Sequence, residues 1–167
     1  MILAFDTHYV NDLATTACVC FENWTDETAR QEFVEITKTV APYEPGKFYK
    51  RELPCIISLL KTHNLDPDLI IVDGYVWLDE TEIGLGGHLH RQLGEKIPVI
   101  GVAKTKFKEH AKVKEVLRGA SQTPLYVSAI GIDLEEAAHN IETMDGNFRL
   151  PTLLKRVDQL CREIVTI

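Results

Sequence analysis

Three acidic residues of this chain stand where a strand ends or a helix begins, and their side chains could bind a metal ion. Asp6 and Asp73 each follow a short apolar run that is typical of a buried strand. Glu52 lies at the start of a predicted helix, where the helix dipole favours a carboxylate. Carboxylate oxygens are ligands of Mg²⁺, and two such ions can hold the attacking and leaving oxygens of a phosphodiester. We therefore expect Asp6, Glu52 and Asp73 to form a metal centre if the fold brings them together.

Each of these acids also has a purely structural interpretation. An aspartate at the end of a strand is often a turn residue or a helix cap. Glu52 could equally be an ordinary acid in the first turn of its helix. The pattern alone does not show that the three side chains meet, so both interpretations stay open at this point.

The elements that would position these acids follow from the hydrophobic pattern. Strands are predicted at residues 1–5, 12–22, 31–40, 69–72, 98–102 and 125–130, and helices at residues 48–63, 83–94, 134–144 and 151–164. The basic segment 106–116 has a spacing that also allows a helix.

This order of elements predicts an α/β fold in which helices flank a mixed sheet, formed by a single domain over residues 1–167. The first strands can pair as antiparallel hairpins, whereas the later strands would lie parallel because helices connect them. Sites in such folds form at the carboxyl ends of strands, which is where Asp6 and Asp73 are expected.

The overall charge is acidic, with 18 Lys and Arg against 25 Asp and Glu, and a net charge of −7. This balance argues against binding to nucleic acid through bulk charge, but it allows a local basic surface. One segment is locally basic and contains Lys104, Lys106, Lys108, Lys112 and Lys114 around Phe107, with Arg118 beyond. These side chains could contact a phosphate backbone, or they could form an ordinary solvated face.

The cysteine pattern and hydropathy concern the compartment. Cys18, Cys20, Cys55 and Cys161 have a spacing that fits neither a zinc site nor a disulfide framework. We expect them to be small buried side chains in a reducing environment. No apolar stretch approaches the roughly 20 residues that span a bilayer. The prediction is a cytoplasmic protein without membrane contact.

Several motifs, in their order and spacing, resemble the endonuclease V family, which cuts nucleic acid beside deaminated adenine (inosine) and has a ribonuclease-H-like fold. The resemblance runs from residue 2 to about residue 162. It is carried by Asp6-Thr7-His8-Tyr9, Pro42-Tyr43-Glu44-Pro45-Gly46, Arg51-Glu52-Leu53-Pro54, Asp73-Gly74, Gly84-Leu85-Gly86-Gly87-His88-Leu89, the segment 97–105, Arg149-Leu150-Pro151 and Val157-Asp158.

The resemblance implies roles for individual residues. Asp6, Glu52 and Asp73 match the family's carboxylates that bind Mg²⁺ or Mn²⁺, the same three that the strand ends select. Lys104 matches the active-site lysine, which would meet a phosphate or the developing charge. The remaining matches imply contact with nucleic acid, through the strand-parting wedge and the basic segment: Tyr9, Pro42, Tyr43, Pro45, Gly46, Lys106 and Lys108.

Two stretches depart from the family pattern. Where the family reads D-G-x-G-x-x-H-P-R, this chain continues from Asp73-Gly74 into residues 75–81 without the His, Pro and Arg. The later V-S-P-G-H-R is also absent, and with it the catalytic histidine. Asp133 lies within a few positions of that histidine, and we hypothesise that it completes the metal site. The alternative is that Asp133 caps the following helix.

These observations lead to two function hypotheses. The first is a metal-dependent endonuclease that hydrolyses phosphodiester bonds of DNA or RNA, beside inosine, in DNA repair or RNA processing. The second is a protein that retains the fold and binds nucleic acid or a partner without catalysis. For either, the expected partner is DNA or RNA and the chain is taken to be a monomer.

Overall fold

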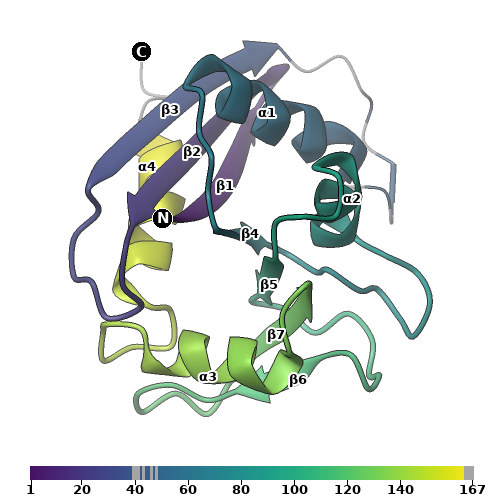
Figure 1. The fold of residues 1–167 in the computed structure, drawn as a ribbon, viewed down its shortest axis with the longest axis vertical. Helices are drawn as coiled ribbons and strands as arrows, with labels where there is room; N and C mark the ends of the chain where they lie inside the picture. Colours follow the sequence, from purple (N-terminus) through teal and green to yellow (C-terminus); the bar gives the residue numbers. More distant parts are fainter. Residues whose placement is uncertain (39–41, 43, 46, 48, 164–167) are drawn as a thin grey trace.

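A computed structural model of the chain describes residues 1–38, 42, 44, 45, 47 and 49–163 (Figure 1). Within these residues a seven-stranded mixed sheet has the strand order β3-β2-β1-β4-β5-β7-β6, and helices lie on both of its faces. The predicted α/β class with a mixed sheet is confirmed.

The first three strands form an antiparallel meander: β1 (Ile2–Val10), β2 (Leu13–Phe21) and β3 (Gln31–Lys38). A two-residue turn joins β1 to β2, and its Asn11 adopts a positive φ of 54°, a conformation that asparagine tolerates in hairpins. β1 continues past Asp6, where the sequence predicted its end, because β2 pairs with it along its whole length.

The centre of the sheet is parallel and buried. β4 (Leu69–Asp73) pairs with β1, and β5 (Val99–Ala103) pairs with β4. Both strands are continuous apolar runs, as expected for strands covered on both faces. The crossovers contain α1 (Tyr49–Thr62) and α2 (Leu85–Gln92), close to the predicted helices.

The far edge of the sheet differs from the prediction in two ways. β7 (Leu125–Ile130) is antiparallel to β5, not parallel, and the expected helix over residues 106–116 is wrong because this segment is a loop that ends in the short strand β6 (Lys114–Val116). The two errors have one cause. Without a helix to carry the chain back across the sheet, the strand after β5 can only return in the opposite direction.

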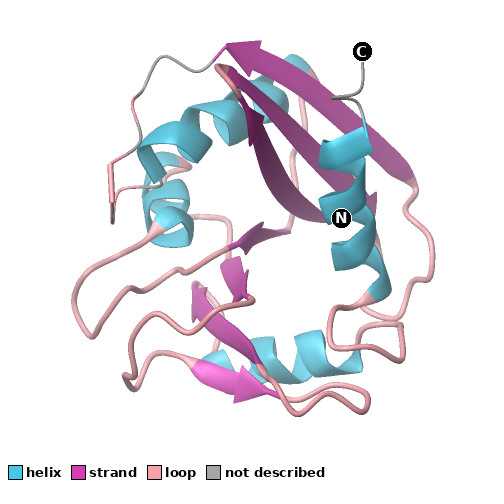
Figure 2. Ribbon diagram, turned by 180° about the vertical axis from the view of Figure 1, so that it is seen from behind, coloured by secondary structure: helices cyan, strands magenta, loops and turns pink. Residues whose placement is uncertain are grey.

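The helices divide between the two faces. α1 and α2 cover the core that contains Leu3, Phe5 and Val72, whereas α3 (Leu134–Thr143) and α4 (Thr152–Glu163) cover the core that contains Ala4 and Ile71. α4 lies behind β1 and β2 in Figure 1 and in front of them in Figure 2. Among the described residues, no helix is long and apolar enough to span a membrane.

Candidate active site

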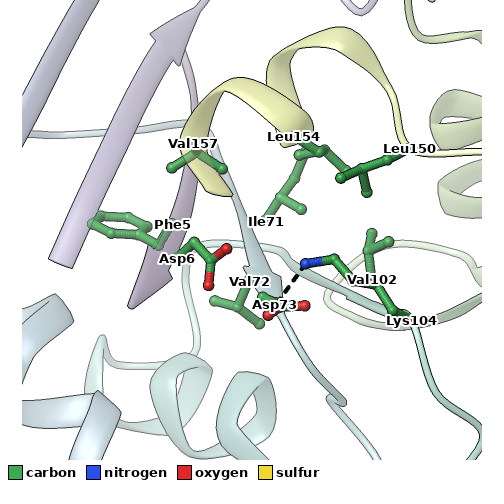
Figure 3. A pocket seen from close by; sticks show the side chains of 10 residues that line it. All are labelled: Phe5, Asp6, Ile71, Val72, Asp73, Val102, Lys104, Leu150, Leu154 and Val157. Carbon is green, nitrogen blue, oxygen red and sulfur yellow. Dashed lines mark ion pairs between the residues drawn. The ribbon is translucent and has the colours of Figure 1, made fainter. Parts of the chain in front are cut away.

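The strand register places Asp6 and Asp73 side by side. The last parallel pair between β1 and β4 joins Phe5 to Val72, so the two aspartates come next on adjacent strands. Side chains alternate along a strand, and Ala4 and Ile71 belong to the core under α3 and α4. Asp6 and Asp73 therefore project toward the same face, as Figure 3 shows.

Lys104 joins the two aspartates from the next strand, just beyond the end of β5. Its Nζ lies 3.9 Å from Asp73 Oδ2 and 3.5 Å from Asp158 Oδ1 (Figure 3 shows the pair with Asp73). The Arg149 guanidinium donates hydrogen bonds to the Lys104 carbonyl and, at 2.8 Å, to the Pro124 carbonyl. The sequence prediction that Lys104 accompanies the carboxylates agrees with this placement.

Asp158 is a member of the site to which the sequence assigned no role. It lies on α4 with its side chain 24% exposed, and it interacts by hydrogen bond with the Asp6 carboxyl. Arg162 Nε donates to Asp158 Oδ1 at 3.2 Å and steadies it. The available signal was that Asp158 borders the apolar stripe of α4, next to the buried Val157 and Cys161.

Glu52 approaches the same edge of the sheet from the opposite face. It belongs to the first turn of α1. It lines one cavity together with Asp73 and Lys104, and the charges of Asp73 and Asp6 act on its carboxyl. All three predicted carboxylates thus gather at the carboxyl ends of β1 and β4, with Asp158 as a fourth.

The carboxyl group of Asp6 is 8% exposed, and burial raises its pKa to about 8, with a further increase from the charge of Asp73 and an opposing effect of Lys104. Burial, then Asp73 and Asp6, raise the pKa of Glu52 to about 8 as well. The pKa of Asp73 is also raised by burial, against the effect of Lys104. Lys104 therefore compensates this group of acids only in part.

The chemistry of this group suits a hard divalent cation. Carboxylate oxygens are the preferred ligands of Mg²⁺ and Mn²⁺, and raised carboxyl pKa values mark a place where added positive charge is favourable. Over the described part of the chain, however, no three His, Cys, Asp or Glu side chains already stand in metal-binding geometry. The carboxylates that could bind the ion are Asp6, Glu52, Asp73 and Asp158.

A cavity of about 490 Å³ opens beside the carboxylates on the α1 and α2 side. Its walls include the aromatic rings of Tyr49, Tyr75 and Phe107 as well as Asp73 and Lys104. This volume is in the range of small-ligand sites, which combine apolar walls with a few polar groups. The cavity is thus large enough for a planar group bound next to the acids.

The residues expected to contact nucleic acid have different surroundings. The ring of Tyr9 is covered by the Arg51 guanidinium, 4.1 Å from its centroid, and the half-buried hydroxyl has no hydrogen-bond partner among the described residues. Pro42 and Pro45 are exposed. Tyr43 and Gly46 lie outside the described residues.

Lys106 and Lys108 are exposed, and each already has an acidic neighbour in the chain. Lys106 Nζ lies 3.9 Å from Glu109, and Lys108 Nζ lies 3.8 Å from Asp79. Both lysines lie on the loop that follows Lys104. Phosphate contact by either one would require it to exchange its partner.

Asp133 takes the alternative role that the sequence left open. It is the N-cap residue of α3, and its carboxylate accepts a hydrogen bond from Glu136 N at 3.2 Å. It is exposed, and it is not among the charges that act most strongly on Asp6, Glu52 or Asp73. The structure therefore supplies the fourth acid from α4, not from the start of α3.

Comparison with known proteins gives a consistent family. Residues 1–123 match the model of the family described as Endonuclease V. An Endonuclease V of Streptomyces avermitilis is 30% identical over 72% of this chain and 61% of its own length, and one of Geotalea uraniireducens is 29% identical over 98% and 77%. The chain thus spans less than two thirds of the Streptomyces protein.

Solved structures agree on the fold. The Endonuclease V of Ciona intestinalis, in complex with a DNA containing an inosine followed by a ribo-adenosine, superposes with a TM-score of 0.84 at 21% identity, over 97% of this chain and 84% of the other. The Streptomyces avermitilis structure gives 0.75 at 26% identity, over 96% and 79%. The Argonaute of A. aeolicus gives 0.62 at 11% identity, over 99% of this chain and 29% of the other, which supports the ribonuclease-H-like class. The chain belongs to the endonuclease V family.

Proposed function

We propose that this chain is a metal-dependent nuclease that hydrolyses phosphodiester bonds. The observation that carries the proposal is the group of carboxylates at one sheet edge, in which Asp6 and Glu52 have pKa values near 8 and Lys104 is the adjacent cation. Members of the endonuclease V family are nucleases. A structural cluster of acids would be expected to separate or to pair fully, and this one does neither.

In the proposed mechanism, Asp6, Glu52, Asp73 and Asp158 hold Mg²⁺ or Mn²⁺. The ion supplies Lewis-acid stabilisation of the phosphoryl oxygens and lowers the pKa of bound water. Lys104 Nζ donates to a phosphate oxygen and stabilises the charge that develops there, because it already lies between Asp73 and Asp158. Arg149 holds the Lys104 main chain and so fixes the direction from which the ammonium approaches.

The proposed substrate is DNA or RNA cut beside a deaminated base. The structure of the Ciona intestinalis relative contains inosine DNA. In this chain the cavity of about 490 Å³ adjoins Asp73 and Lys104, and the rings of Tyr75 and Phe107 can take a planar base. Such a reaction would serve DNA repair or RNA processing.

Cleavage of oligonucleotides tests the proposal. DNA and RNA strands with and without one inosine would be incubated with the protein and Mg²⁺ or Mn²⁺. Asp73→Asn should lose cleavage, whereas Asp66→Asn should retain it, because Asp66 is an exposed acid just before the amino end of β4. Absence of cleavage by the wild type, or equal cleavage by Asp73→Asn, would contradict the proposal.

One observation favours the second candidate function, a binding protein without catalysis. The described residues contain no preformed metal-binding group, and the chain lacks the family's histidine. This candidate predicts binding of the same oligonucleotides without turnover, together with an affinity for Mn²⁺ that Asp73→Asn does not change. Isothermal titration with Mn²⁺ separates it from the nuclease.

A further inference from the structure

One tyrosine side chain connects the exits of two neighbouring strands. Tyr75 lies just after β4, and its hydroxyl donates a hydrogen bond to the Thr105 carbonyl at 2.6 Å. The same oxygen accepts a hydrogen bond from Phe107 N at 3.0 Å. Tyr75 therefore satisfies two backbone groups of the segment that begins at Lys104.

The main chain around Tyr75 is itself held in place. The Tyr75 carbonyl accepts from Gly86 N at 3.1 Å, and Val76 N donates to Ser128 Oγ at 2.9 Å. Val76 is fully buried. The tyrosine side chain thus extends from a rigid base in the sheet to a loop that is exposed from residue 105 to residue 109.

Lys104 lies between two such attachments. Arg149 binds its carbonyl on one side, and Tyr75 binds the next carbonyl along the chain, that of Thr105. A lysine side chain is long and flexible, so the place of its ammonium depends on where its main chain is held. Displacement of a reacting group by about 1 Å can cost roughly 100-fold in rate.

We propose that Tyr75 is a positioning residue, whose hydroxyl fastens the segment after β5 so that Lys104 Nζ stays among the carboxylates. This inference rests on the proposed function, because it assigns Tyr75 an effect on the reaction through Lys104. In the family pattern D-G-x-G, position 75 is the unspecified one, so the contact is a property of this chain.

A simpler role for Tyr75 is packing. Its ring lies 6.1 Å from that of Phe107 and lines the cavity wall. Tyr75→Phe separates the two roles, since it keeps the ring and removes only the hydroxyl. Tyr126→Phe is the matched control, because Tyr126 lies on β7 opposite Ala103 and makes neither of the two hydrogen bonds.

The experiment measures three quantities on full-length protein: the exchange rate of the Phe107 amide by NMR, the melting temperature, and kcat and KM for oligonucleotide cleavage with Mn²⁺. For Tyr75→Phe we expect faster exchange at Phe107 and a kcat lower by about 10- to 100-fold, with KM changed less than about twofold. Tyr126→Phe should leave all three unchanged.

Other results overturn the inference. Fast exchange at Phe107 with an unchanged kcat would mean that the hydrogen bonds form but do not matter for Lys104. Unchanged exchange at Phe107 would mean that Tyr75 does not fasten the segment. Equal losses of melting temperature, kcat and binding would indicate packing alone. A wild type that cleaves no strand rejects the proposed function and the inference with it, whereas an active wild type with an equally active Tyr75→Phe rejects the inference alone.

Discussion

The acidic loop that follows β4 is expected to compete with nucleic acid for a lysine of the basic segment. Asp79 Oδ2 lies 3.8 Å from Lys108 Nζ, and Glu80 Oε1 accepts a hydrogen bond from Ala111 N at 2.8 Å. Because Asp79 occupies Lys108 in the free protein, a phosphate must displace it. Removing the charge of Asp79 should therefore strengthen binding to DNA or RNA.

Asp79→Asn is a clean perturbation of this contact. Asp79 Oδ1 accepts from Thr81 N at 2.9 Å and from Glu82 N at 2.8 Å, and an asparagine carbonyl can accept the same two hydrogen bonds. The other oxygen, which faces Lys108, becomes a neutral amide group. The loop should keep its turn while Lys108 becomes free.

The magnitude follows from the number of phosphates neutralised. One additional lysine–phosphate contact steepens the slope of log K against log salt by about 0.7 for a single strand and about 0.9 for a duplex. At a salt concentration of about 0.1 M this equals roughly 5- to 8-fold tighter binding. The gain should shrink as the salt concentration rises.

Fluorescence anisotropy with a labelled oligonucleotide, in EDTA so that no cleavage occurs, measures this effect over a salt series. The matched control is Asp26→Asn. Asp26 also accepts two backbone hydrogen bonds, from Glu22 N and Asn23 N, but it lies in the β2–β3 connection at the opposite end of β1. An unchanged slope for Asp79→Asn, or an equal gain for Asp26→Asn, would refute the reasoning.

Three further outcomes are expected. Arg118→Leu should lower the free energy of unfolding in urea by about 3 kcal/mol or more, because the buried guanidinium donates to carbonyls of the segment 142–149 that would lose their partner. Gly101→Ala should cost about 1–3 kcal/mol in the same assay and slow cleavage, because its Cβ would lie 2.5 Å from the Gly74 carbonyl oxygen, next to the site. Arg156 lowers the pKa of Glu32, so their pair stabilises the fold above pH 4.5 and loses this effect as the pH falls through the lowered pKa. The melting-temperature deficit of Glu32→Gln, worth less than about 1 kcal/mol, should therefore vanish in acid, and a deficit that persists there would contradict the assignment.

The parts of the site that could be predicted are those that local patterns determine. A continuous apolar run ends where its strand leaves the sheet, so Asp73 was correctly placed from its neighbours alone. Glu52 followed from its place at the start of a helix. The end of β1 could not be predicted in this way, because β1 is extended by pairing with β2 and its own sequence shows no boundary.

Asp158 shows why the remainder was missed. Its place among the acids depends on α4 packing across β1 and β2, elements that lie more than a hundred residues earlier in the chain. The direction of β7 depends in the same way on how the chain returns after β5. Asp133 had the more visible signal, close to a missing motif, yet that signal was equally that of a helix cap.

The charge distribution has a consequence for how nucleic acid could bind. The acidic excess is concentrated partly at Asp6, Glu52, Asp73 and Asp158, where Lys104 offsets only some of it. The lysines of the loop that follows are held by acids of the same chain. A phosphate backbone therefore meets little free positive charge until a cation enters the site or the lysines exchange partners. Binding should accordingly tighten when Mg²⁺ is added, and this increase should disappear in Asp73→Asn.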